Sequence, residues 1–227
     1  MGSRAAVILD VDGTLVDSND AHARAWIDAF SEFGITVAYD AVRRSIGMGG
    51  DKLMPEVSGI SESSELGQRI SSRRGEIFRQ RYLPAIAAFP RTRELIERFL
   101  ADGLALAVAS SAKEDELEPL LQRAGVADLV RQRTSSDDAD ESKPDPDIVL
   151  AALRHAGVNR QRAVMLGDTP YDVAAARRAG LEIVGLECGG WTREALAGAV
   201  AVYRDPAELL VRYDESPFAV LRAGARP

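Results

Sequence analysis

The sequence has little cysteine and no long apolar run, and both absences exclude broad classes of protein. Cys188 is the single cysteine in 227 residues, which excludes an internal disulfide framework and a cysteine-rich zinc site. The apolar run near mid-chain, residues 104–109, is far shorter than the roughly 18 residues that a membrane span needs. The N-terminus also lacks the charged region and long apolar region of a signal peptide. We therefore expect a cytoplasmic protein with no membrane partner.

Positive charge is scarce as well. Lys and Arg total 28 against 35 for Asp and Glu, which gives a formal net charge of −7. Proteins that bind a nucleic-acid backbone usually carry a basic stripe, so we expect no nucleic-acid partner. A small anionic substrate is compatible with this charge, because a few local cations or a metal ion can bind one. The pattern G-x-x-x-x-G-K-[ST] is absent, which excludes a P-loop nucleotide hydrolase.

Short apolar runs alternate with amphipathic helical segments over most of the chain. Apolar residues make up 46% and charged residues 28%, a balance typical of a globular protein with a sizeable core. The alternation indicates βαβ units, so we predict an α/β fold with a parallel sheet. Residues 36–86 contain no convincing strand and are broken by glycines and prolines, which indicates a helical insert. The expected strands are 5–9, 104–109, 127–134, 163–166, 183–186 and 200–202, and the main expected helices are 19–33 (capped by Asn19 or Asp20), around 95–100, 114–123, 145–155 and 171–179.

Reactive side chains follow the predicted strands at four separate places in the chain. In open α/β sheets, ligands bind just beyond the carboxyl ends of the strands. Because these ends meet at one edge of the sheet, we expect the side chains to form a single site. They are Asp10 and Asp12, Ser110, Lys143, and Asp168 with Asp172.

The residue types at these positions favour phosphate chemistry. Asp10 and Asp12, two residues apart, suit a hard cation such as Mg²⁺, and Asp168 could add a third oxygen ligand. An ionised carboxylate beside Mg²⁺ can attack phosphorus and form an aspartyl phosphate. Lys143 offers a compact positive charge and Ser110 a hydroxyl for phosphate oxygens. The alternative is that residues 10–14 form an ordinary turn whose side chains cap the next helix.

Four motifs resemble those of the haloacid dehalogenase-like (HAD) superfamily of hydrolases, in the same order and spacing. The first is DVDGTLVDS at residues 10–18, and the second is the strand-end Ser110 in LALAVASSAK. The third is Lys143 in SKPDPDIVL, and the fourth is MLGDTPYDVAAARRAG, which contains Asp168 and Asp172. The resemblance runs from the first strand to about residue 210.

The resemblance implies a Rossmann-like core with an inserted α-helical cap domain. The core would comprise residues 1–17 and 88–227, and the cap would comprise residues 18–87. Hinges are expected near residues 17–20 and 84–90. Such a cap opens for substrate and closes to exclude water that is not positioned for attack.

The resemblance also implies roles for the strand-end residues. Asp10 is similar to the family's nucleophile, and Asp12 to the general acid that protonates the leaving oxygen and then activates water. The implied Mg²⁺ ligands are Asp10, Asp12 through its backbone carbonyl, and Asp168, while Ser110 and Lys143 would hold the phosphate and Asp172 would orient Lys143 or a metal-bound water.

Further residues are expected to contact the substrate. His22 and Lys52 would do so from the first helix and the cap, although a hinge histidine and a solvated lysine fit the sequence as well. Arg73 and Arg74 could contact a distant anion, but a solvated helix face is the favoured interpretation. The expected substrate-binding residues are Gly13, Thr14, His22, Gly49, Lys52 and Ser111.

Asp12 restricts which of the family's reactions the resemblance implies. Relatives that cleave carbon–halogen or carbon–phosphorus bonds lack this aspartate, so the resemblance implies a Mg²⁺-dependent phosphatase. The substrate would be a small phosphorylated metabolite, such as a sugar phosphate or phosphoglycolate, and the protein a monomer or weak dimer. A β-phosphoglucomutase-like mutase is an alternative, because His22 and Trp26 are similar to that enzyme's helix, but Gly50 stands where it uses an arginine. A phosphoaspartate signalling protein, which would accumulate the intermediate, or a non-catalytic binding protein are further alternatives.

Overall fold

The computed structural model describes residues 5–222, so residues 1–4 and 223–227 of the expected core lie outside the described part. Its centre is a parallel sheet of five strands in the order β2-β1-β3-β4-β5. The predicted α/β fold with a parallel sheet is confirmed. The strands are β1 (Ala6–Leu9), β2 (Ala105–Val108), β3 (Ala163–Gly167), β4 (Glu182–Leu186) and β5 (Ala201–Tyr203).

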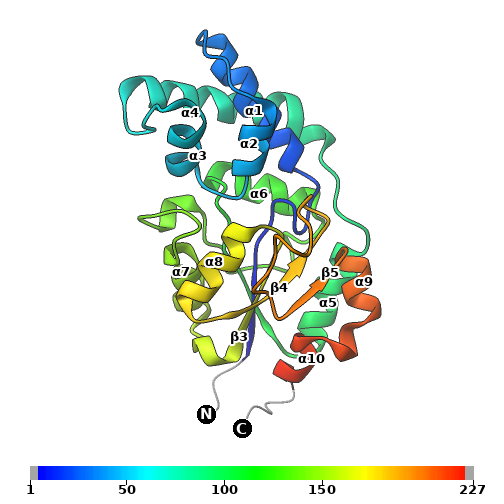
Figure 1. Ribbon diagram of the computed structural model, residues 1–227. Helices are drawn as coiled ribbons and strands as arrows, with labels where there is room; N and C mark the ends of the chain where they lie inside the picture. Colours follow the sequence, from blue (N-terminus) through cyan, green and yellow to red (C-terminus); the bar gives the residue numbers. More distant parts are fainter. Residues whose placement is uncertain (1–4, 223–227) are drawn as a thin grey trace.

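Helices cover both faces of this sheet (Figure 1). Alternate residues of β1 point to opposite faces, so Val7 and Leu9 join one apolar cluster while Ala6 and Ile8 join the other. Strands buried on both faces require continuous apolar runs, which is why AVIL forms β1, an interior strand of the sheet. The surrounding helices are α5 (Thr92–Ala101), α6 (Glu114–Arg123), α7 (Asp147–Ala156), α8 (Pro170–Ala179), α9 (Pro206–Val211) and α10 (Pro217–Arg222), with short 3-10 helices at Ser136–Asp138, Arg160–Arg162 and Tyr213–Glu215.

A second group of helices lies beyond the carboxyl ends of the strands (Figure 1). The chain enters and leaves this group side by side, since Asp17 N donates to Ala87 O at 3.0 Å and Val16 pairs with Ala88. These crossings coincide with the expected hinges, whose movement and exact domain boundaries stay predictions. The group comprises α1 (Asn19–Glu32), α2 (Tyr39–Ser45), α3 (Gly50–Ser58) and α4 (Glu65–Ile77), followed by a π-helical turn (Phe78–Tyr82) and a 3-10 turn (Leu83–Ala85).

The predicted helices 114–123, 145–155 and 171–179 are confirmed to within two residues. The predicted strand at 127–134 is wrong, because Gln132 makes only a single bridge to Ala107. Residues 127–129 form a turn instead, and the Arg133 side chain donates to the carbonyls of Ala127 and Val130. Within residues 5–222, no helix is both long enough and apolar enough to cross a bilayer.

Candidate active site

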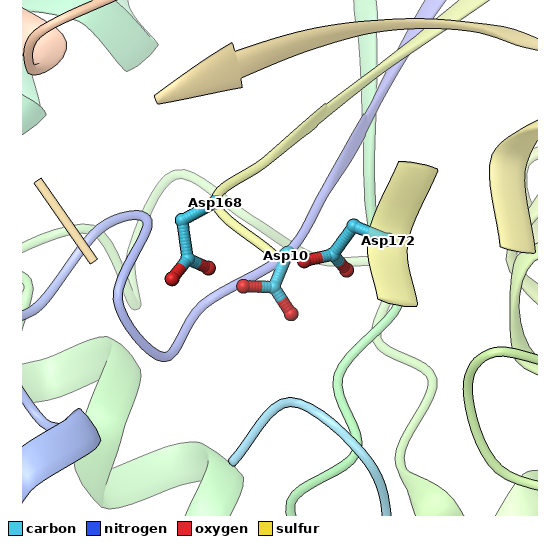
Figure 2. A group of neighbouring side chains, drawn as sticks. All are labelled: Asp10, Asp168 and Asp172. Atoms are coloured by element: carbon cyan, nitrogen blue, oxygen red, sulfur yellow. The ribbon is translucent and has the colours of Figure 1, made fainter. Parts of the chain in front are cut away.

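The sheet brings three buried aspartates together at the carboxyl ends of β1 and β3 (Figure 2). Asp10 directly follows β1, and its backbone N–H donates to Leu166 O of β3 at 2.9 Å. Asp168 directly follows β3. Asp172 lies in the first turn of α8, where its carboxylate accepts bonds from the backbone N–H and hydroxyl of Thr169 at 3.0 and 2.7 Å. This reciprocal cap of α8 fixes Asp172 beside Asp10.

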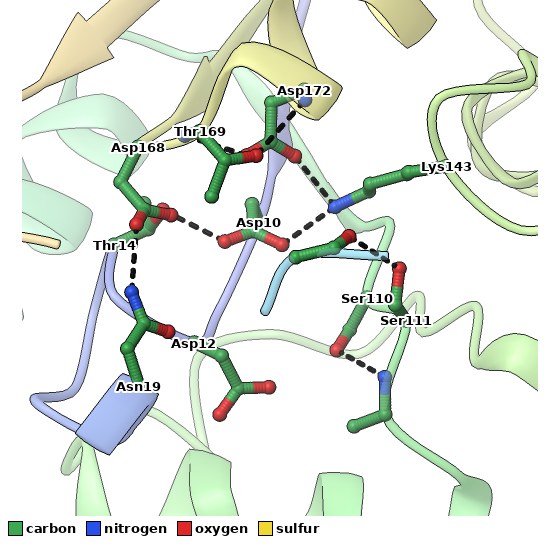
Figure 3. Close-up of polar contacts among 12 residues, drawn as sticks. Asp10, Asp12, Thr14, Asn19, Ser110, Ser111, Lys143, Asp168, Thr169 and Asp172 are labelled. Atoms are coloured by element: carbon green, nitrogen blue, oxygen red, sulfur yellow. Dashed lines mark hydrogen bonds and ion pairs between the residues drawn. The ribbon is translucent and has the colours of Figure 1, made fainter. Parts of the chain in front are cut away.

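Lys143 is the cation that contacts two of these aspartates, Asp10 and Asp172 (Figure 3). Its side chain is 1% exposed, and Nζ lies 2.6 Å from Asp10 Oδ1 and 2.7 Å from Asp172 Oδ1. Burial alone would lower the pKa of Lys143, but the two carboxylates raise it above its ordinary value, so the ammonium stays charged. Burial raises the pKa of Asp10 to about 7, against the opposing charge of Lys143.

The three carboxylates fit a hard divalent cation. Each offers an oxygen within 4.8 Å of the others. Burial, followed by the charges of Asp10 and Asp172, raises the pKa of Asp168 well above its ordinary value. The Thr14 hydroxyl lies 2.8 Å from Asp10 Oδ2 and 3.0 Å from Asp168 Oδ1, yet it has only one proton to donate. A cation between these oxygens would relieve the excess of negative charge, and Mg²⁺ prefers such ligands.

Two glycines leave room for the Asp168 carboxylate, and an asparagine donates a hydrogen bond to it. A Cβ added to Gly13, which has φ +75°, would lie 2.2 Å from both Asn19 Nδ2 and Asp168 Oδ2. A Cβ on Gly189 would lie 1.7 Å from Asp168 Oδ2. Asn19 Nδ2 donates to Asp168 Oδ2 at 2.9 Å and to Gly189 O at 3.0 Å. Asn19 therefore orients the carboxylate that would bind the metal.

The prediction that Asn19 or Asp20 caps the first helix is wrong. Helix α1 begins at Asn19 after Ser18, and no side chain bonds its open N–H groups there. The Asn19 carboxamide is used by Asp168 instead, while Asp20 accepts a bond from Arg43. Nothing local in the sequence separates a capping asparagine from one that orients a distant carboxylate.

Asp12 lies beside this cluster with its own partners. Ser18 Oγ donates to Asp12 Oδ1 at 2.5 Å, and His22 Nε2 lies 2.8 Å from the same oxygen. Burial favours a raised pKa, but His22, the hydrogen bond from Ser18 and the charge of Lys143 together outweigh it and hold the pKa of Asp12 below its ordinary value. The His22 ring stacks on Phe78 with centroids 4.0 Å apart, which fixes its orientation. Both contacts use Oδ1, and no contact of Oδ2 is seen among the described residues.

Two serines, Ser111 after β2 and Ser142 before Lys143, connect the core to the helical group. Ser110 is buried, and its Oγ accepts a bond from Ala112 N at 3.1 Å. Ser111 Oγ donates to Gly47 O at 3.2 Å. Gly49 N donates to Ser142 Oγ at 3.1 Å, next to Lys143. The loop 47–49 is thereby held over the cluster.

Comparison with known proteins identifies the family. Residues 7–186 match the family described as haloacid dehalogenase-like hydrolase. The chain belongs to the haloacid dehalogenase-like hydrolases. Over 214 residues it is 31% identical to a phosphoglycolate phosphatase of Rhodospirillum rubrum, an alignment that covers 90% of this chain and 88% of that protein.

Two solved structures share the fold of this haloacid dehalogenase-like hydrolase. A hydrolase from Pseudomonas syringae has a TM-score of 0.86 and 32% identity, covering 93% of this chain and 99% of that chain. CbbY from Rhodobacter sphaeroides, solved in complex with phosphate, has a TM-score of 0.74 and 26% identity, covering 91% of this chain and 96% of that chain. Because each likeness covers more than nine-tenths of this chain, it includes both the sheet and the helices beyond it.

The three basic residues that the sequence analysis considered for substrate binding, Lys52, Arg73 and Arg74, lie in different settings. Lys52 Nζ contacts Ser142 O and the carboxylates of Glu141 and Asp145, and it is not among the residues that line the cavity at Asp10 and Asp12. Its role in substrate binding stays a prediction.

The two neighbouring arginines of α4 differ. Arg73 pairs with Glu32 and Glu76 at the surface, as expected for a solvated helix face. For Arg74 that expectation is wrong, since its side chain is 8% exposed and its guanidinium pairs with the fully buried Glu116 of α6. The sequence could not reveal this pair, because its members lie 42 residues apart on two different helices.

Metal binding can be tested without measuring turnover. We expect Mg²⁺ to raise the melting temperature, because a ligand that binds only the folded state at 100 times its Kd stabilises it by about 2.7 kcal/mol. Asp168→Asn should lose most of this rise, since it removes a charged oxygen ligand. Differential scanning fluorimetry with Mg²⁺ and with EDTA measures both, and Asp40→Asn, an exposed aspartate on α2, is the matched control. An equal rise in Asp168→Asn would contradict the metal site.

Proposed function

We propose that this protein is a Mg²⁺-dependent phosphatase that hydrolyses a small phosphate monoester, a sugar phosphate or a phosphoglycolate-like compound, through an aspartyl phosphate on Asp10. The observation that carries the proposal is the setting of Asp10. One of its oxygens faces the Lys143 ammonium and the other lies toward Asp168, with Asp12 nearby (Figure 3). His22 contacts Asp12 in turn. The named activity of the Rhodospirillum rubrum relative, a phosphoglycolate phosphatase, supports it.

In the first step, an Asp10 carboxylate oxygen attacks phosphorus, and the bond between phosphorus and the leaving oxygen breaks. The Lys143 ammonium offsets the charge of the phosphoryl oxygens, and the Ser110 hydroxyl can donate to one of them. A divalent ion held by Asp10 and Asp168 would add to this charge neutralisation. Asp12 gives its proton to the leaving oxygen. A bound phosphate favours the protonated form of Asp12, because like charges disfavour ionisation.

In the second step, Asp12 takes a proton from a water molecule that attacks phosphorus. The bond between phosphorus and Asp10 breaks, which releases inorganic phosphate and restores the carboxylate. His22 and Ser18 hold Asp12 in one orientation through both steps, since both contact its Oδ1.

Replacement of Asp12 separates the two steps. With p-nitrophenyl phosphate, whose leaving group needs little protonation, Asp12→Asn should still form the intermediate but hydrolyse it about 10²- to 10⁴-fold more slowly. Stopped-flow measurement should then show a burst of about one p-nitrophenolate per enzyme, followed by slow release. Steady release of p-nitrophenolate at the wild-type rate, with no initial burst, would contradict the role of Asp12.

The proposed reaction is tested by assaying the purified protein with Mg²⁺ against a panel of phosphate monoesters. Release of inorganic phosphate that EDTA abolishes is the expected result. Phosphorus NMR of hexose phosphate reactions distinguishes the mutase alternative, which would yield an isomerised phosphosugar instead of inorganic phosphate. Accumulation of phosphoaspartate without turnover would favour the signalling alternative. The cytoplasmic location and the monomeric or weakly dimeric state stay predictions.

A further inference from the structure

The space beside the site is much larger than a phosphate group requires. Asp10 and Asp12 line a small cavity of about 50 Å³, which adjoins a cleft of about 650 Å³. Gly50, Arg74 and Ser111 line both and form the wall between them. A substrate whose phosphate lies at Asp10 therefore extends its leaving group along this shared wall.

Glu62 lines the cleft next to Gly50 of the shared wall. A Cβ added to Gly50 would lie 2.7 Å from Glu62 Oε1, so the carboxylate takes the space that a side chain at this position would fill. Ser71 Oγ donates to the same oxygen at 2.6 Å, and Lys113 Nζ donates to Ser71 Oγ at 3.1 Å. The cleft thus presents a carboxylate, a hydroxyl and an ammonium in one connected row.

The two arginines of the cleft are already engaged by carboxylates. Arg74 Nη1 lies 2.9 and 2.8 Å from the two carboxylate oxygens of Glu116. Arg79 pairs with Asp115. Lys113, which contacts the Ser71 hydroxyl, is then the cleft cation that no carboxylate among the described residues engages, while five acidic side chains line the same cleft. A second acidic group on a substrate would therefore meet a net excess of negative charge around Glu62.

We propose that Glu62 is a specificity-determining residue that favours leaving groups with hydroxyls over leaving groups with a second anion. The inference rests on the proposed phosphatase function and names its substrate class, a sugar or polyol monophosphate. A substrate hydroxyl can donate to Glu62 and accept from Lys113. An ionised carboxylate or a phosphate dianion has no proton to donate to Glu62, and the acidic residues of the cleft repel it more than the single Lys113 ammonium attracts it. Such repulsion is an effective means of discrimination.

Two matched pairs of substrates test this in the unmodified protein. Glycerol 3-phosphate and 3-phosphoglycerate differ only in a hydroxymethyl group against a carboxylate, as do glucitol 6-phosphate and 6-phosphogluconate. We expect kcat/KM to favour the hydroxylated member of each pair by about 10-fold or more. Equal values, or a preference for the acids, would overturn the inference while leaving the phosphatase intact.

Glu62→Gln then tests the residue itself. The amide keeps an acceptor for Ser71 and the shape of the wall but removes the charge. The acids should gain about 10-fold in kcat/KM, mainly through a lower KM, and the hydroxylated members should lose about 2- to 5-fold, because a neutral acceptor is weaker. Glu65→Gln, an exposed glutamate in the first turn of α4, is the matched control and should leave both pairs unchanged.

The outcomes separate the inference from the function on which it rests. A shift in the preference between acid and polyol with Glu62→Gln alone supports the inference. Identical shifts in Glu62→Gln and Glu65→Gln, or no shift in either, would overturn it. Failure of the wild type to release phosphate from all four esters and from p-nitrophenyl phosphate would overturn the phosphatase, and the inference with it.

Discussion

Asp10→Asn should abolish turnover and leave the protein folded. The amide is too weak a nucleophile to attack phosphorus, so phosphate release should fall by about 10⁴-fold or more. The fold should persist, because Lys143 keeps Asp172 as its partner at 2.7 Å and the amide has nearly the shape of the carboxylate. Phosphate release measures the first effect, and circular dichroism with the melting temperature measures the second.

The matched control for Asp10→Asn is Asp40→Asn, which makes the same chemical change at an exposed position of α2. The control should retain wild-type turnover. Retained activity in Asp10→Asn would refute the assignment of Asp10 as nucleophile. Loss of both activity and secondary structure would show that the carboxylate is needed for folding.

Lys143→Met should have the largest effect on stability. The substitution leaves the Asp10 and Asp172 carboxylates buried without their cation, and breaking such a pair costs about 3–5 kcal/mol. Turnover should also fall by about 10³-fold or more, because a cation that offsets charge on a transferring phosphoryl group contributes that much. Urea denaturation in EDTA measures the free energy of unfolding, and phosphate release measures turnover.

A second variant separates the two roles of Lys143. Adding Asp172→Asn to Lys143→Met removes one uncompensated charge, so the double variant should regain part of the lost stability but none of the lost turnover. Lys52→Met is the control for stability, since its ion pairs are partly exposed and worth about 1 kcal/mol or less. Equal stability of Lys143→Met and Lys52→Met would contradict the buried ion pair.

The central fold and the strand-end cluster could be predicted because local patterns encode them. The apolar run AVIL specifies a buried strand, and the acid that follows it must lie at the carboxyl edge of the sheet. Thr169 and Asp172 match a helix-capping pattern, a threonine followed three residues later by an acid, which is visible in the sequence. The reciprocal cap that they form also orients Asp172. The spacing along the chain therefore carries the geometry of these residues.

The missed residues depend on contacts that no local pattern contains. Asn19 meets Gly189 across 170 residues of sequence, and its role depends on that loop. From the sequence alone, Arg74 is expected at the surface of α4, because its partner Glu116 lies on a different helix, α6. The role proposed for Glu62 depends on Gly50, which leaves room for the Glu62 carboxylate. Only the three-dimensional structure shows that these two residues are neighbours.

Covalent trapping of the intermediate tests the central claim most directly. Wild type and Asp12→Asn are mixed with p-nitrophenyl phosphate and Mg²⁺, quenched in acid within the first turnover, digested and examined by tandem mass spectrometry. We predict the mass of one phosphoryl group on Asp10, with higher occupancy in Asp12→Asn and none in Asp10→Asn. A phosphoryl group on any other residue, or wild-type turnover with no adduct at any quench time in either protein, would contradict Asp10 as the nucleophile.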